Sequence, residues 1–217
     1  MPVAAATRPT TKKEQREASV EKLLAAALAQ FVSRGYRHTT VEQIADTAGL
    51  TKGSVYFYFR SKAALLDQLL DRVEAIVVDP IPERLAEAGS DPRDRMVAFV
   101  HGQAMLGIEK WEYVLLLILM SLEFAGSGDA IERRITAIYD RLYRHVEAII
   151  ADGKRSGAFR ADVSAREQAA VVMAGHDGTF LEWYRRKDAL DGPALVRALR
   201  TATLGGLAAP NTTRKGD

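Results

Sequence analysis

The chain has 217 residues, of which 47% are hydrophobic and 27% charged, as in an ordinary globular protein of one sizeable domain or two small ones. It contains no cysteine, which excludes disulfides and thiolate metal sites and favours a reducing compartment. Residues 1–62 hold ten Lys or Arg against five Asp or Glu, whereas residues 63–217 hold 20 against 23. Positive charge is therefore concentrated at one end, as expected if that end meets a polyanion.

The sequence gives no sign of a membrane partner, a cofactor or a metal. The longest apolar run, Tyr113–Leu122, is too short to span a bilayer, which takes about 20 residues. The N-terminal stretch has charges but no apolar core behind them, so no secretory signal is expected. The four histidines show no ligand-like spacing. These features predict a cytoplasmic protein without a bound metal or cofactor.

The N-terminal elements follow from residue spacing. Residues 1–17 are small, polar and basic, and we expect a flexible arm there. From Val20 to Phe31 apolar residues recur at i, i+3, i+4 and i+7, which predicts a helix that ends near Gly35. A fourth helix is expected from Ser61 to Val77, where two prolines end it.

Between these helices lies the most informative stretch of the chain. Thr40 and Gln43 form a capping-box pattern at the start of a second helix, which Gly49 ends. Thr51 can cap a short third helix. Two short helices with a glycine turn between them are the geometry of a helix-turn-helix, whose second helix lies in the DNA major groove.

The rest of the chain also predicts helices. Apolar spacing, capping patterns and glycine stops place them at about 91–108, 113–125, 131–153 or 131–157, 164–186 and 192–205. No run alternates apolar and polar residues for long enough to predict a strand. We therefore expect an all-α fold of about nine helices, with a DNA-binding domain over 18–66, a ligand-binding and dimerisation domain over 67–210 and a tail over 211–217.

The residues of the helix-turn-helix suit contact with DNA. Small or cationic residues at the start of the third helix let its backbone approach DNA, and Lys52 can reach a phosphate or a guanine edge. Tyrosine hydroxyls and helix N-termini favour phosphates. Packing and capping are the alternative roles for the tyrosines and threonines. The expected DNA-binding residues are Thr39, Thr40, Thr51, Lys52, Gly53, Ser54, Tyr56, Phe57, Tyr58 and Lys62.

This segment resembles the tetracycline-repressor (TetR) family of bacterial regulators. The resemblance runs from Val20 to about Leu70 and rests on Gly35-Tyr36, Thr39-Thr40-Val41, Ile44-Ala45, Ala48-Gly49, Lys52-Gly53-Ser54, Tyr56-Phe57-Tyr58-Phe59 and Ser61-Lys62. Tyr58 stands where many members carry histidine, so an aromatic donor is kept. Beyond residue 70 only helix order and total length resemble the family.

The resemblance implies a homodimer that binds a palindromic operator and pairs through its last two long helices. It also implies a small-molecule effector in a C-terminal cavity, which moves the helix after the DNA reader and releases the operator. Repressor and activator roles both remain open, with the repressor preferred. An architectural DNA-binding protein is one alternative. An enzyme is another, although the chain has no phosphate loop, nucleophile elbow, HExxH motif or cysteine nucleophile.

The effector site is expected among aromatic, apolar and a few polar residues of the C-terminal part. The candidates are Phe99, Gln103, Leu106, Trp111, Leu116, Met120, Glu123, Phe124, Tyr139, Tyr143 and His176. Ordinary core packing is the alternative for each of them singly. Because apolar groups dominate, the expected effector is an apolar or aromatic small molecule.

Two polar candidates leave alternatives open. Glu123 follows an apolar run, so it either enters the interior, where it would favour a cationic ligand, or faces water at a helix end. His176 either contacts the ligand or forms a hydrogen bond at the dimer interface. Small residues on the same helix suit close packing across the dimer, and these are Ala170, Ala174, Gly175 and Gly178.

Overall fold

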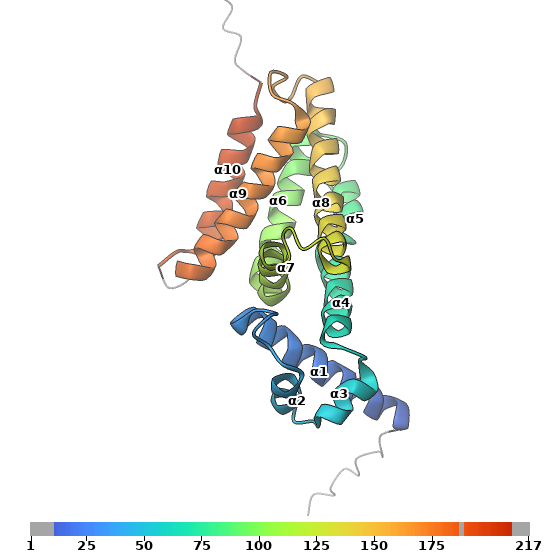
Figure 1. Ribbon diagram of the computed structural model, residues 1–217. Coiled ribbons are helices and arrows are strands. Elements are labelled where there is room, and N and C mark those ends of the chain that lie inside the picture. The colour runs from blue at the N-terminus through green and yellow to red at the C-terminus, as the bar shows by residue number, and fades with distance from the viewer. Residues whose placement is uncertain (1–10, 187–188, 210–217) are drawn as a thin grey trace, which may run out of the picture. The chain divides into compact units, whose positions relative to one another are not determined.

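The computed structural model describes residues 11–186 and 189–209 and divides the chain into two compact units, 1–69 and 70–217. The described residues form ten α-helices and one π-helical segment, with an isolated bridge between Phe159 and Ala208 as the only β pairing (Figure 1). The prediction of an all-α fold is confirmed.

The first unit contains α1 (Lys12–Arg34), α2 (Val41–Ala48), α3 (Lys52–Tyr58) and most of α4 (Lys62–Val73). α2 packs against both α1 and α3. The core of the first unit consists of fully buried side chains from all four helices, namely Leu23, Leu24, Ala27, Phe31, Ile44, Val55, Leu65, Leu66 and Leu69.

The N-terminal helix is longer than the apolar spacing predicts. α1 begins at Lys12 because Thr11 and Glu14 form a reciprocal capping box, in which the Thr11 amide donates to the Glu14 carboxylate over 2.6 Å. The expectation of a flexible arm is therefore wrong for residues 12–17, while residues 1–10 lie outside the described part of the chain. The expected tail over 211–217 also lies outside it.

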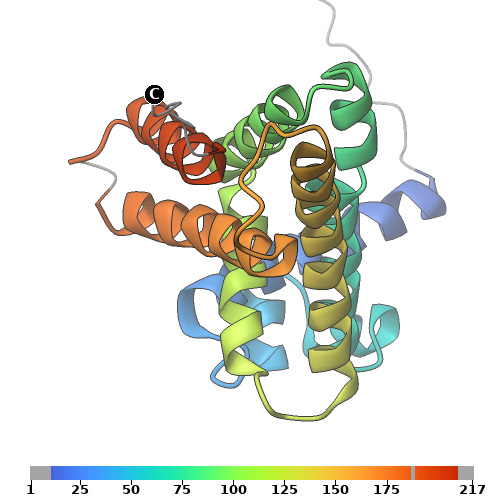
Figure 2. The same ribbon diagram turned by 90° about the horizontal axis from the view of Figure 1, so that it is seen from above.

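The second unit is a bundle around α6 and α8. It comprises the π-helical segment η1 (Glu74–Val78), α5 (Ile81–Glu87), α6 (Pro92–Glu109), α7 (Trp111–Glu123), α8 (Ala130–Arg155), α9 (Ala165–Arg186) and α10 (Gly192–Leu207). α6 packs against α7, α8, α9 and α10, and α9 lies between α8 and α10 (Figure 2).

Pro80 and Pro82 were expected to end the fourth helix at Val77, but the structure continues past them in helical form. The helix expected to run to Val77 is α-helical only to Val73 and continues as η1. Pro82 then lies in the first turn of α5, a short helix that the sequence did not predict. Proline is tolerated there because the first amides of a helix have no intrahelical acceptor, so its missing N–H costs no hydrogen bond.

Candidate DNA-binding and effector sites

The helix-turn-helix is built by local capping. Thr40 accepts a hydrogen bond from the Gln43 amide over 3.2 Å, and the Gln43 side chain accepts one from the Thr40 amide over 2.9 Å. Gly49 ends α2 in the left-handed region, with a φ of 66° that favours glycine. Thr51 then caps α3 by accepting a hydrogen bond from the Ser54 amide. These contacts fix the turn that presents α3.

One face of α3 is buried and the other is unusually apolar for an exposed surface. Val55 is fully buried and anchors the helix, and Phe59 is buried just after it. On the other side, Tyr56 is 50% exposed and Phe57 is 79% exposed. Exposed large aromatic side chains often mark an interaction surface. Here Tyr56 stands beside Lys52, whose ammonium lies 5.9 Å from the centre of the Tyr56 ring, and Phe57 packs edge-on against Tyr58.

Gly53 has no packing reason to be glycine. It is exposed, and a Cβ atom at its position would meet only the Thr51 hydroxyl, at an ordinary 3.7 Å. Glycine inside a helix costs about 1 kcal/mol relative to alanine. A close approach of the α3 backbone to an external partner would account for that cost.

Lys52 forms an ion pair with Glu42 of α2. The hydrogen bond from Lys52 lowers the pKa of Glu42, and the same contact raises the pKa of Lys52. Both side chains are about half exposed, so the pair is screened by solvent and weak. A phosphate or a base edge can therefore compete with Glu42 for the ammonium group.

Two of the expected DNA contacts are engaged inside the unit. Thr39 is 1% exposed, and its hydroxyl lies 2.8 Å from the Gly35 carbonyl oxygen. The Lys62 ammonium donates to the carbonyl oxygens of Tyr36 and Thr39, over 2.6 and 2.7 Å, and lies 4.2 Å from the centre of the Tyr36 ring. These contacts speak against phosphate binding by the two side chains, because both hold the loop between α1 and α2 in place.

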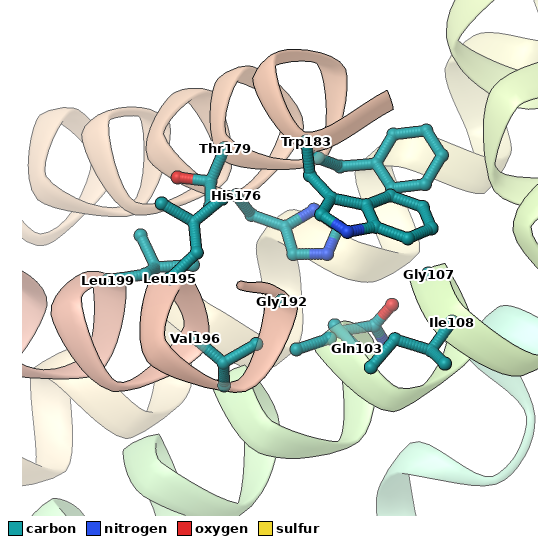
Figure 3. Close-up of a pocket in the computed structure, with 12 residues that line it drawn as sticks. Gln103, Gly107, Ile108, His176, Thr179, Trp183, Gly192, Leu195, Val196 and Leu199 are labelled. Carbon is teal, nitrogen blue, oxygen red and sulfur yellow. The ribbon is translucent and has the colours of Figure 1, made fainter. Parts of the chain in front are cut away.

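The second unit contains a narrow apolar pocket between α6, α9 and α10. Figure 3 shows His176 and Trp183 extending from α9 into the space between this helix and Gln103 of α6, and Thr179 of α9 also lines the pocket. The α10 side chains Leu195, Val196 and Leu199 close the other side. Its internal volume is about 40 Å³, room for little more than water. Sites for drug-sized ligands occupy several hundred Å³, so an effector of that size requires the pocket to widen.

The polar side chains of this pocket form hydrogen bonds with groups of the surrounding helices. Gln103, 2% exposed, donates its side-chain amide to the Val77 carbonyl oxygen over 3.0 Å. His176 places Nδ1 3.0 Å from a carboxylate oxygen of Asp177, whose other oxygen accepts a hydrogen bond from the Tyr139 hydroxyl over 3.3 Å. Burial, followed by the charge of Asp177, raises the pKa of Tyr139.

Of the candidates expected from the sequence, only Gln103 and His176 line this pocket. Tyr139 borders a smaller space behind it, and Tyr143 lies in a polar surface groove beside Arg144 and Arg166. The pocket lies closer to α10 than the sequence suggested. The remaining apolar candidates pack in the core or are partly buried around it, namely Phe99, Leu106, Trp111, Leu116, Met120 and Phe124.

Glu123 is the last residue of α7 and is partly exposed. It is not among the residues that line the pocket between α6, α9 and α10. This position favours the helix-end interpretation over the buried anchor for a cationic ligand.

Sequence reasoning missed most of the pocket wall. The unassigned residues are Ala104, Gly107, Ile108, Thr179, Phe180, Trp183, Gly192, Leu195, Val196 and Leu199. A signal was present, because His176, Thr179, Phe180 and Trp183 follow the i, i+3, i+4, i+7 spacing of one helix face. Instead, the small residues of α9 led to the prediction of a dimer interface on a different face of the same helix.

That other face of α9 is exposed. Ala170, Ala174 and Gly178 face solvent, and Val171 is 72% exposed. A Cβ atom at Gly178 would meet nothing within 4 Å. An apolar groove continues from this face to the Leu199 and Leu207 side of α10.

Metal clusters and membrane-spanning helices are both absent from the described ranges 11–186 and 189–209. No group of three or more His, Cys, Asp or Glu side chains there could hold a metal ion. None of the helices in the same ranges combines the length and the apolar character needed to cross a membrane.

Comparisons with known proteins agree with this geometry. The family described as "Bacterial regulatory proteins, tetR family" matches residues 23–69, which include α2, α3 and most of α4. The solved structure of the MbdR regulator from Azoarcus sp. CIB is 49% identical, with a TM-score of 0.80, over 88% of this chain and 100% of that one. The transcriptional regulator TtgR of Pseudomonas putida is 25% identical over 83% of this chain and 87% of its own.

A third relative was solved with a ligand. The transcriptional regulator FadR from Bacillus subtilis, in complex with stearoyl-CoA, has a TM-score of 0.69 over 86% of this chain and 98% of that one. It is 20% identical, so the likeness shows the fold alone.

Proposed function

Because the chain belongs to the tetR family of bacterial regulatory proteins, and is thus a transcriptional regulator that binds DNA, we propose that it is a repressor released by an apolar or aromatic effector. In this proposal a homodimer binds a palindromic operator in the cytoplasm. The observation that supports DNA binding by α3 is its exposed face, which carries Tyr56, Phe57 and Lys52, with the Lys52 ammonium over the Tyr56 ring.

The residues proposed to meet DNA are those of α3 and its cap. We propose that Lys52 and Ser54 contact base edges or phosphates and that Gly53 allows the backbone to come close. Thr40 and Thr51 keep their capping role and offer helix N-termini to phosphates. Tyr56 and Tyr58 supply hydroxyls, and Phe57 supplies exposed apolar surface.

Dimerisation is proposed through α9 and α10. The small face around Gly178 permits close helix approach, and the exposed Val171 together with the groove along α10 supplies apolar surface. A two-fold dimer presents two copies of α3, which matches a two-fold operator.

The effector is proposed to enter between α6, α9 and α10. Leu207 is the one buried residue of α10, so the helix can shift at modest cost and enlarge the space. Apolar walls favour an apolar body, while Gln103 and His176 offer one end for a polar group.

The test is selection of a binding site from a random DNA library with the full chain. The selected duplex should be palindromic and should bind at least 10³-fold more tightly than scrambled DNA at the same salt concentration. An architectural protein would bind both with similar, strongly salt-dependent affinity.

Sedimentation of the same sample should give about twice the 23.8 kDa of one chain. A monomer at micromolar concentration would contradict the dimeric repressor. Among compounds that raise the unfolding temperature, the effector should also reduce operator binding, and turnover of such a compound would favour the enzyme alternative.

A further inference from the structure

The segment that directly continues α4 is held in an unusual helical form. In η1, the Asp79 amide donates to the Glu74 carbonyl oxygen, five residues earlier, over 2.9 Å. π-helical turns are rare in proteins and frequently lie at functional sites. Returning this segment to α-helical hydrogen bonding would rotate it by about one residue, or 100°, relative to the helix on either side.

Two prolines leave the segment short of backbone donors. In the π pattern the Val77 carbonyl oxygen would accept from residue 82, which is proline and has no N–H. Pro80 removes the corresponding donor for Ala75. A buried carbonyl oxygen without a partner is costly, and the Gln103 side chain supplies the missing donor to Val77.

The outer side of the segment is held by α8. Arg134 pairs with Asp71 and Glu74, and Arg141 donates to Glu74 over 2.9 Å and to Asp79 over 2.6 Å. η1 is therefore held on one side by ion pairs with these arginines and on the other by the hydrogen bond from Gln103.

Gln103 is also a wall residue of the effector pocket. It borders both the pocket under α10 and the smaller space that Val77 and Tyr139 line. Because the amide has a second N–H and an oxygen, a ligand group breaks the bond to Val77 only where it draws the side chain into the pocket, out of reach of that carbonyl.

We propose that Gln103 reads the effector: a polar group on an otherwise apolar ligand draws its amide away from Val77 and releases η1, and with it the last turn of α4. This inference rests on the proposed function. It predicts that effectors carry a hydrogen-bonding group, such as a hydroxyl or carbonyl, and that hydrocarbons of the same shape bind without releasing the operator.

The test compares Gln103→Leu with Thr179→Val, which changes another polar residue of the same pocket that has no bond to η1. Hydrogen exchange of the amides of residues 74–79 should become at least tenfold faster in Gln103→Leu and stay within twofold in the control. Affinity for an operator selected with the wild type should fall about tenfold in the same variant without any ligand, a typical coupling between sites.

A second variant covers the case in which Gln103→Leu does not fold. Arg141→Gln loosens the same segment from the α8 side, at a partly exposed position, and should move both readouts in the same direction. Faster exchange with unchanged operator affinity would overturn the proposal, and so would unchanged exchange. If the wild type selects no operator, the proposed function fails, while the exchange experiment still decides whether Gln103 controls η1.

Discussion

α3 and α9 both expose apolar side chains, yet what surrounds these side chains differs. On α3, the exposed Tyr56 and Phe57 share a short helix with a lysine and hydroxyl groups, whereas on α9 the exposed Val171 stands among alanines and glycines. The first surface suits a polyanion, since cations and donors meet phosphates. The second suits another copy of itself, because small residues allow helices to pack closely. Exposure alone would not have separated the two.

The largest effect is expected from a charge on the α9 surface. Gly178→Glu should dissociate the dimer, because two-fold symmetry brings two like charges into one interface. Loss of the bivalent contact should reduce operator affinity by about 10²–10⁴-fold. Sedimentation and operator titration measure the two effects.

Ala86→Glu is the matched control, since it adds the same charge at an exposed position of α5. A dimeric Gly178→Glu protein would remove this face of α9 from the proposed interface.

The next effect concerns the stability of the DNA-binding unit. Lys62→Met removes the ammonium group that donates to two carbonyl oxygens. We expect the unit to lose about 2 kcal/mol of stability, since hydrogen bonds from charged groups contribute about 1.5–3 kcal/mol. Hydrogen exchange of residues 36–40 measures the change, with the exposed Lys22→Met as control. A Lys62→Met protein with wild-type stability and weak DNA binding would instead restore Lys62 as a phosphate contact.

Substitutions on the exposed face of α3 should weaken operator binding without unfolding the protein. Lys52→Ala and Tyr56→Ala should each weaken operator binding by about 1–3 kcal/mol at fixed salt. Neither should alter the dimer, which separates this surface from that of α9. Lys110→Ala removes the same charge in the second unit and should leave operator affinity unchanged. Wild-type affinity in both α3 variants would exclude α3 as the reader.

The smallest effect is a loss of stability, expected when Tyr139 loses its hydrogen bond to Asp177. Tyr139→Phe removes the hydroxyl that donates to Asp177, with an expected loss of about 0.5–1.5 kcal/mol. Thermal unfolding measures this loss, and operator affinity should remain that of the wild type because the contact lies outside both exposed surfaces. A large fall in affinity would show that the Asp177 cluster, rather than Gln103, is linked to DNA binding.

Local signals in the sequence were sufficient for the helix-turn-helix. The Thr40 capping box, the turn at Gly49 and the Thr51 cap each involve residues within a few positions of one another, and the structure forms all three. The all-α fold also follows from spacing within single helices. The exposed face of α3 also follows from the sequence. In a helix of seven residues, burying Val55 leaves the opposite side facing outwards.

Long-range packing decided the rest. Lys62 was expected to bind phosphate because it lies just past the third helix. Its partners in the structure, Tyr36 and Thr39, lie more than 20 residues earlier in the chain, so local spacing does not reveal them. The pocket gathers residues from α6, α9 and α10, and the bond from Gln103 to Val77 spans 26 residues. Helical spacing shows which residues share a face of one helix. It does not show which helix that face meets, because this depends on how all the faces of the bundle are buried together.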